Sequence, residues 1–140
     1  MQKFKVGSLF AGVGGICLGF KNAKFEDYAY SLSWANEIDQ YACETYRTNF
    51  EHSVLEGDIN KILDISLCRE DEKERYEQMQ NEILSKNVDI LTAGFPCQAF
   101  TCTLLLTFGD LYSQYKKARP SFSQVLLFYS INPTGPCTRE

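Results

Sequence analysis

The sequence predicts an α/β fold, in which a mostly parallel sheet carries helices on its faces. Four short apolar segments alternate with stretches of helical spacing, which is the pattern of parallel strands joined by crossover helices. The 140 residues are 44% hydrophobic and 23% charged, which is typical of a globular domain and excludes a mostly disordered chain. No apolar run approaches the roughly 20 residues that a membrane-spanning helix needs.

The first half of the chain supplies three of the expected strands. Residues 4–10 predict a strand that runs into a glycine-rich loop, and residues 16–22 predict the helix that follows. The loose alternation of residues 28–34 indicates a second strand. Residues 39–50 have helical spacing and begin with an aspartate, which is a preferred helix cap. Residues 53–55 predict a third, short strand.

A highly charged segment precedes the fourth strand. Residues 67–86 have helical spacing with only a thin apolar stripe at Tyr76, Met79 and Ile83. We interpret this segment as a solvated helix and not as a binding site. The apolar residues 88–93 then predict the fourth strand.

Each predicted strand ends in residues that can carry chemistry. The first ends in the glycine-rich loop, and the other three lead to Glu37, Asp58 and Cys97. Ligands of open parallel sheets bind beyond the carboxyl ends of the strands. We therefore expect one ligand site in which these four strand ends meet.

The glycine-rich loop spans residues 10–15 and contains Gly12, Gly14 and Gly15. Glycines let a backbone turn sharply and approach a ligand closely, because no Cβ intervenes. A dinucleotide-binding loop would have a third glycine where this chain has Cys17. The loop therefore favours a nucleoside ligand over a pyrophosphate, although such loops are also common as plain tight turns.

The acids at the next two strand ends extend this interpretation. Glu37 lies 22 residues after Gly15, near the spacing at which an acid binds ribose hydroxyls. Ile38 beside it can pack on an adenine face, and Asp58 can accept a hydrogen bond from the exocyclic amine of adenine. The simpler alternatives are a solvated surface acid at Glu37 and a plain turn at Asp58.

Among the six cysteines, Cys97 is the candidate nucleophile. It follows Pro96 at a strand end, where a side chain can be exposed and held rigidly. A thiolate is the reactive form, so the site must lower the pKa of this thiol. The alternative is a buried, inert thiol, which is what we expect of most of the others. The cysteines are scattered and His52 is the single histidine, so we expect no metal site.

Four segments together resemble the first four motifs of the cytosine-5 DNA methyltransferases in order and spacing. They are residues 10–15, 36–39, 57–59 and 94–100, the last containing Phe-Pro-Cys-Gln. The resemblance covers residues 4 to about 101. It implies a Rossmann-like, S-adenosylmethionine-dependent methyltransferase fold, present here in its N-terminal part and incomplete.

The resemblance also implies which residues act. Those that would bind or border S-adenosylmethionine lie at the strand ends and are Phe10, Gly12, Gly14, Gly15, Glu37, Ile38, Asp58, Ile59 and Pro96. Ile59 would flank the adenine together with Ile38, and Pro96 would shape the nucleophile loop. Cys97 would attack carbon 6 of a cytosine flipped out of the duplex, since that atom is unreachable in the stack.

The resemblance stops near residue 102. Residues 1–102 carry 10 basic and 16 acidic residues, whereas residues 103–140 carry 4 and 2 and contain three of the four prolines. We interpret residues 1–102 as the cofactor and nucleophile half, and residues 103–140 as a non-matching tail, frameshifted or disordered. The family's Glu-Asn-Val motif, whose Glu would assist the attack, has no counterpart in the sequence.

The sequence thus predicts a DNA (cytosine-5)-methyltransferase in truncated or split form, inactive or weak by itself. DNA is the expected partner, and a second chain would supply the acid and the target-recognition domain. The alternative is a non-catalytic S-adenosylmethionine-binding fragment or pseudoenzyme. We expect a cytoplasmic protein, nucleoid-associated when on DNA, since the N-terminus lacks the features of a signal peptide.

Overall fold

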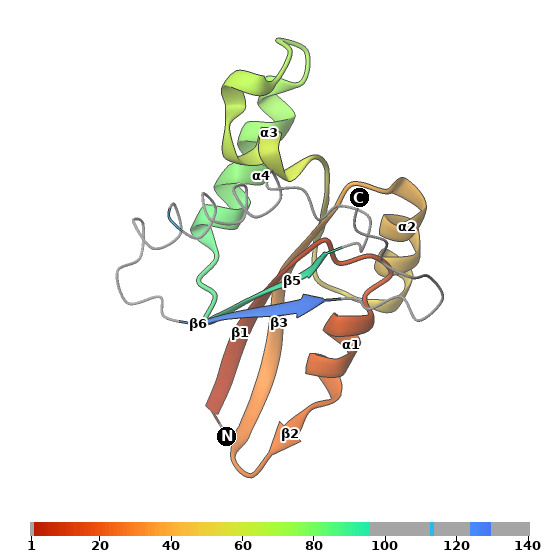
Figure 1. Ribbon diagram of the computed structural model, residues 1–140, viewed down its shortest axis with the longest axis vertical. Coiled ribbons are helices and arrows are strands. Elements are labelled where there is room, and N and C mark those ends of the chain that lie inside the picture. Colours follow the sequence, from red (N-terminus) through yellow and green to blue (C-terminus); the bar gives the residue numbers. More distant parts are fainter. Residues whose placement is uncertain (1, 96–112, 114–123, 130–140) are drawn as a thin grey trace, which may run out of the picture.

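The computed structural model describes residues 2–95, 113 and 124–129 of the chain. In that part, strands form one sheet with helices packed against it (Figure 1). The elements are β1 (Gln2–Leu9), α1 (Gly15–Asn22), β2 (Lys24–Phe25), β3 (Tyr28–Glu37), α2 (Gln40–Asn49), β4 (Val54–Glu56), α3 (Ile59–Leu63), the short 3₁₀ helix η1 (Ile65–Leu67), α4 (Lys73–Ser85), β5 (Ile90–Phe95) and β6 (Gln124–Tyr129).

The sheet has the strand order β2-β3-β1-β5-β6, with β4 paired to β3. All of these pairings are parallel except the short β2–β3 pair. The chain moves outward from β1 on one side through β3 to β4, and then returns to β5 on the other side. The strand order therefore reverses beside β1, and such a reversal is where open α/β sheets bind ligands. The predicted α/β fold with a mostly parallel sheet is confirmed.

Two apolar clusters cover the two faces of the sheet. On one face Cys17 of α1 and Tyr46 of α2 pack with Ala35 of β3. On the other face, Ile62 of α3 and Ile83 of α4 pack in the cluster that contains Trp34 of β3. Between the two clusters, the carboxyl-terminal half of β1 is buried from Val6 to Leu9.

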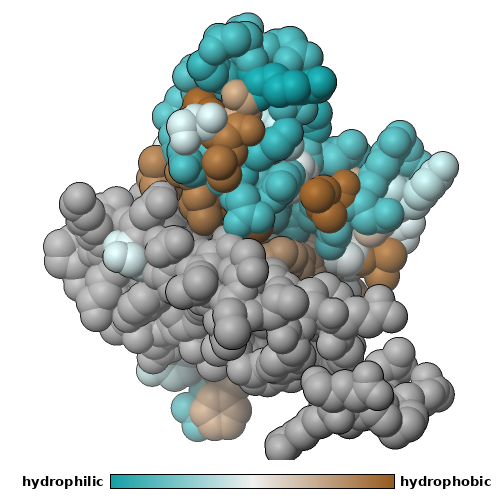
Figure 2. Space-filling view, turned by 45° about the horizontal axis from the view of Figure 1, so that its top comes forward, coloured by the Kyte–Doolittle hydropathy of each residue, from teal (hydrophilic) through white to brown (hydrophobic). Residues whose placement is uncertain are grey.

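The charged segment differs from the expected continuous helix. Residues 67–86 contain the end of η1 and then α4, which begins only at Lys73. The tip that holds α3 and α4 has a mostly hydrophilic surface, in keeping with the predicted solvated face (Figure 2). Tyr76 and Ile83 of the predicted apolar stripe are nevertheless buried, with 6% and 2% of their surfaces exposed.

Three elements were not expected from the sequence: β2, α3 and η1. Asp58 begins α3, because its Oδ1 accepts a hydrogen bond from the backbone N–H of Asn60 at 2.9 Å. The expected cap of α2 is confirmed, since the Asp39 carboxylate accepts from the N–H of Ala42 at 2.7 Å. Short helices with few apolar residues leave little periodic signal, which is why α3 was missed.

The strand β6 lies within the segment 103–140 and pairs with β5 in parallel from Ile90 to Phe95. The short apolar run of residues 125–129 lies within this strand. The frameshift origin of residues 103–140 stays a prediction. Among the described residues, no helix combines the length and the hydrophobicity needed to cross a membrane.

Candidate ligand site at the carboxyl edge of the sheet

The loop between β1 and α1 has a left-handed backbone at three positions. Phe10 has φ 52°, Gly12 has φ 55° and Gly14, the N-cap of α1, has φ 97°. This conformation costs a residue with a side chain roughly 1–2 kcal/mol, whereas glycine adopts it freely. The glycine spacing in the sequence therefore corresponds to a real backbone requirement at Gly12 and Gly14.

The glycines of the loop differ in what surrounds them. A Cβ on Gly14 would lie 2.2 Å from Cε2 of Phe50 and 3.1 Å from Cδ2 of Tyr46, so α2 leaves no room there. A Cβ on Gly12 or Gly15 would meet nothing within 4 Å. Gly14 is therefore needed to pack the loop on α2, while Gly12 and Gly15 leave open space beside the backbone. That space suits the cradle predicted for a ligand.

The residues beneath Gly14 form an aromatic support. The rings of Tyr46 and Phe50 stack with their centroids 4.4 Å apart. The Tyr46 hydroxyl and Nε2 of His52 share a hydrogen bond of 2.6 Å. Burial raises the pKa of the Tyr46 hydroxyl and lowers the pKa of His52. Both groups are therefore held in their neutral forms, which suits a support that is packed and not charged.

Glu37, at the end of β3, ties the glycine loop to the neighbouring strand. Its Oε2 accepts a hydrogen bond from the N–H of Gly12 at 2.7 Å, and its Oε1 accepts from Ile38 and Asp39 at 2.8 and 3.0 Å. A carboxylate has about four acceptor positions, so these three bonds leave capacity for a ligand hydroxyl. Its role as the ribose ligand stays a prediction.

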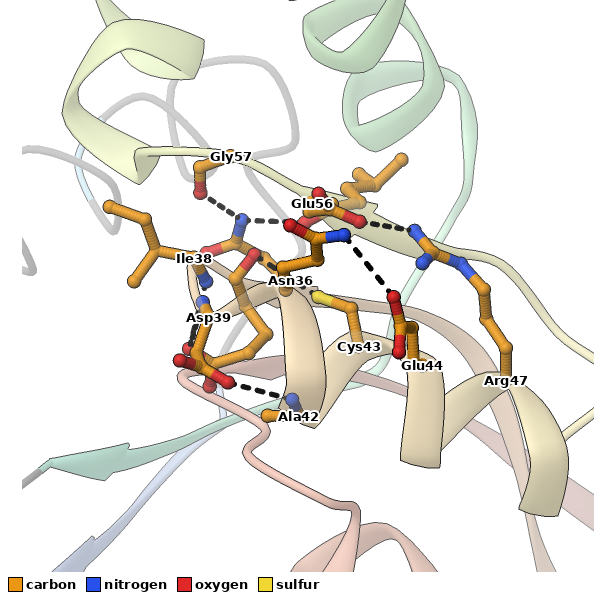
Figure 3. Close-up of polar contacts among 12 residues, drawn as sticks. Asn36, Ile38, Asp39, Ala42, Cys43, Glu44, Arg47, Glu56 and Gly57 are labelled. Atoms are coloured by element: carbon orange, nitrogen blue, oxygen red, sulfur yellow. Dashed lines mark hydrogen bonds and ion pairs between the residues drawn. The ribbon is translucent and has the colours of Figure 1, made fainter.

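Asn36 connects the ends of β3 and β4 (Figure 3). Its side chain is buried and Nδ2 donates to the carbonyls of Leu55 and Gly57 at 3.0 and 2.9 Å. Its own carbonyl accepts from the N–H of Ala11 at 3.0 Å. One residue thereby links the loops that follow β1, β3 and β4. No role for Asn36 was predicted, because its burial at the strand end is visible only in the structure.

A cavity of about 290 Å³ lies beyond β4. Its lining residues come from the ends of β3 and β4, from α3 and from α4, and are Ile38, Glu56, Gly57, Asp58, Lys61, Arg75 and Tyr76. Ile38 is 64% exposed and thus available to a ligand. This volume is near the lower end of small-molecule sites, about 300–1,000 Å³.

Three lining residues of the cavity come from segments that were not predicted to belong to the site. Lys61 is on α3, and Arg75 and Tyr76 are on α4. The interpretation of the charged segment as a solvated helix that is not a binding site stays a prediction, although Tyr76 on this helix is buried and lines the cavity. An aromatic residue at helical spacing is expected both in a hydrophobic core and beside a ligand site. Only the tertiary structure shows which of the two roles it has.

The remaining predicted site residues are not brought to this cavity by the described structure. Ile59 is only 4% exposed and packs in the apolar cluster under α3, so its contact with an adenine stays a prediction. Pro96 and Cys97 lie outside the described residues, directly after the end of β5 at Phe95. Their roles also stay predictions.

Three other cysteines behave as expected of structural thiols. Cys17, Cys43 and Cys68 are free and buried. Burial raises the pKa of each of these thiols, that of Cys43 to about 11. Thiols with raised pKa values are poor nucleophiles near neutral pH. The expectation that most cysteines are small buried hydrophobes is confirmed for these three.

The chain matches a family of known proteins. The family model for C-5 cytosine-specific DNA methylase matches residues 4–103. The chain belongs to this family. The match begins where the motif resemblance begins and ends within two residues of where it stops, which confirms the family predicted from the four motifs.

Curated methylase relatives extend well beyond this chain. Type II methyltransferase M.BbvI of Brevibacillus brevis is 34% identical, over 96% of this chain and 36% of that protein. M.NlaX of Neisseria lactamica is 39% identical, over 70% of this chain and 25% of that protein. A methyltransferase of Entamoeba histolytica, EhMeth, superposes on 92% of the chain with a TM-score of 0.49 and 15% identity, over 38% of that structure. The chain thus spans about a third or less of the curated relatives described.

Proposed function

We propose that this chain is the cofactor-binding and nucleophile-bearing part of a DNA (cytosine-5)-methyltransferase. The observation that carries the proposal is that hydrogen bonds connect the loops at the carboxyl ends of β1, β3 and β4. There, the N–H of Gly12 binds the Glu37 carboxylate, and Asn36 fixes the turn at Gly57. An edge built in this way presents an open glycine loop, an acid and a small cavity in one row, as a nucleoside cofactor requires.

S-adenosylmethionine fits these residues and, when bound, supplies the electrophilic methyl group for carbon 5 of cytosine. Gly12 and Gly15 leave open space beside the loop backbone, where a Cβ would meet nothing within 4 Å. Glu37 accepts a hydrogen bond from a ribose hydroxyl at its remaining acceptor position. Ile38 packs against the adenine, and Asp58 accepts a hydrogen bond from the adenine amine. Phe10, Gly14, Ile59 and Pro96 complete this assignment, which the family resemblance supports.

Cys97 is the proposed nucleophile toward DNA. Its thiolate adds to carbon 6 of a flipped-out cytosine, and the adduct makes carbon 5 nucleophilic. Loss of the carbon 5 proton and departure of the thiolate then restore the ring. We propose that a further acid and a target-recognition domain, from the rest of the polypeptide or a second chain, complete the enzyme. We propose a cytoplasmic protein that is nucleoid-associated when on DNA.

Cofactor binding is the first test. We expect calorimetry to show that the purified chain binds S-adenosylmethionine, and that Glu37→Gln weakens binding about tenfold because a charged acceptor is lost. Glu44→Gln is the matched control, since Glu44 is exposed on α2 and accepts from Gln40 at 3.2 Å. Absence of binding by the unaltered chain, or equal losses in both variants, would contradict the proposed site.

Transfer of a labelled methyl group to DNA tests the catalytic part. We expect little transfer by the chain alone, and transfer that requires Cys97 when the missing parts of the enzyme are added. The control is Cys97→Ser, which should abolish transfer and leave cofactor binding intact. If Cys97→Ser were as active as the unaltered chain, the nucleophile assignment would be wrong. Binding without transfer under all conditions would favour a non-catalytic cofactor-binding protein.

A further inference from the structure

Helix α4 carries a buried tyrosine that touches the turn at the end of β4. Tyr76 is 6% exposed and is flanked on its helix by charged residues that face solvent. Its hydroxyl accepts a hydrogen bond from the backbone N–H of Asp58 at 3.3 Å. The same side chain lines the cavity that Ile38 and Asp58 border. Tyr76 therefore contacts both the backbone of the turn and the space in which a base would lie.

The turn packs directly on the Tyr76 ring. A Cβ on Gly57 would lie 3.1 Å from Cε1 of Tyr76 and 3.3 Å from Sδ of Met79, which is tighter than an ordinary contact. The absence of a side chain at Gly57 thus lets the turn approach α4 closely. Asn36 holds the other side of this turn through the Gly57 carbonyl. The turn is consequently clamped between β3 and α4.

Ionic contacts hold α4 in place beside the turn. Lys61 of α3 pairs with Glu72 at 2.8 Å, and its ammonium lies 5.6 Å from the centroid of the Tyr76 ring. Arg75 donates to the carbonyl of Glu56 at 2.5 Å. Both cations thus bind α4 to the elements on either side of Gly57–Asp58, and the position of the Tyr76 hydroxyl is set from several directions.

We propose that Tyr76 is a positioning residue that aims the Asp58 carboxylate and so sets the preference for a 6-amino purine in the cavity. The inference rests on the proposed function, because it assigns Tyr76 to the adenine end of the same site. It goes beyond the motif resemblance, since α4 lies between the segments 57–59 and 94–100 that carry the motifs. Tyr76 acts through Asp58 and does not itself donate to the base.

The measured quantity is the preference for one base over another. This preference depends on Tyr76 if the residue positions Asp58, and not if Tyr76 only stabilises the fold. The probes are S-adenosylhomocysteine and its deaminated counterpart S-inosylhomocysteine, in which an oxo group replaces the amine. We expect the unaltered chain to prefer the adenosyl compound. Tyr76→Phe keeps the ring and removes the hydroxyl, and we expect it to reduce the ratio of the two dissociation constants about threefold or more.

Two further variants make the measurement decisive. Gly57→Ala pushes the turn away from the Tyr76 ring without removing a polar group, and we expect it to reduce the ratio in the same direction. It also serves if Tyr76→Phe does not fold, as judged by its thermal unfolding. Tyr41→Phe is the matched control, because Tyr41 lies on α2 and is 76% exposed, and its ratio should equal that of the unaltered chain.

Each of four results would overturn the proposal. An unaltered ratio in both Tyr76→Phe and Gly57→Ala would show that the turn is aimed by other residues. An equal weakening of both compounds would assign Tyr76 a role in stability alone. A chain that binds both compounds equally well would leave the cofactor site standing and refute its base preference, whereas a chain that binds neither would refute the proposed function as well.

Discussion

The two halves of the candidate site are held by different kinds of interaction. The glycine loop is held by one side-chain bond, from the N–H of Gly12 to Glu37, and mainly by shape, because Gly14 has a left-handed backbone and lies against Phe50 with no space for a Cβ. The turn at Gly57–Asp58 is held mainly by polar side chains, since Asn36 donates to one of its carbonyls and Tyr76 accepts from one of its N–H groups.

This difference determines how each half responds to substitution. A steric requirement is all or none, because a Cβ that overlaps a ring forces the backbone or the ring to move. Polar contacts are lost one at a time, and the loss of each one lowers the free energy of unfolding by a moderate amount. We therefore expect abrupt effects at the loop and graded effects at the turn.

The largest effect is expected at Gly14. Gly14→Ala introduces an unfavourable φ and a clash with Phe50, which together should lower the free energy of unfolding by about 3–4 kcal/mol and abolish cofactor binding. Gly12→Ala carries the unfavourable φ without the clash and should cost only about 1–2 kcal/mol. Urea unfolding gives the free energy of unfolding of each variant. The difference between the two values is the contribution of the clash with Phe50.

The control for this pair is Gly19→Ala. Gly19 lies on the exposed side of α1, where a Cβ meets nothing within 4 Å and φ is not left-handed. Alanine favours a helix over glycine, so this variant should be more stable by about 0.5–1 kcal/mol. Equal stabilities for Gly12→Ala and Gly14→Ala would show that packing on α2 does not hold the loop.

A smaller, graded effect is expected at Asn36. Asn36→Ala leaves the carbonyls of Leu55 and Gly57 without their buried donor, and should cost about 2–3 kcal/mol in denaturant unfolding. Asn49→Ala is the matched control, since its amide donates to the Thr45 carbonyl on the exposed side of α2. A loss at Asn36 no greater than that at Asn49 would contradict the clamp at the turn.

The smallest effect is expected from the aromatic support beneath the loop. Burial, together with Lys86 and Lys21, lowers the pKa of His52 below its usual 6.5. The unfolded chain therefore binds a proton more readily than the folded one, and stability is lost as the pH falls from about 6.5 through the lower pKa of the folded state. Above that window this contribution is constant.

His52→Gln tests this prediction, because glutamine can still bond to the Tyr46 hydroxyl but does not titrate. Urea unfolding from about pH 5 to pH 8 should show a shallower decrease on the acid side for the variant than for the unaltered chain. Identical slopes would mean that His52 takes up a proton in the folded state at its ordinary pKa.

Much of the fold could be predicted because its signals are local. The four expected strands and the cap of α2 at Asp39 depend on residues within a few positions of each other. The placement of Glu37 and Asp58 at one edge also followed, since parallel strands bring their carboxyl ends together. The hairpin strand β2 and the helix α3 were missed because two and five residues are too few to show a period.

The supporting residues of the site could not be predicted, because they act from distant positions in the chain. Tyr76 lies 18 positions from Asp58, and the charged residues around it indicated a solvated helix. Asn36 had no visible partner until the fold brought β4 beside β3. The packing of Ile59 in the apolar cluster at the start of α3 likewise depends on distant residues, and its predicted contact with a base stays a prediction.

The sequence by itself determined the alternation of strands and helices, the family, and the glycine and acid positions at the strand ends. Only the tertiary structure decided which glycine of the loop must lack a side chain for packing, because Phe50, the residue that Gly14 approaches, is 36 positions away. It also decided that Asn36 and Tyr76 clamp the turn beside the cavity. Local periodicity records which residues are buried, whereas contacts between distant residues depend on how the buried faces are assembled.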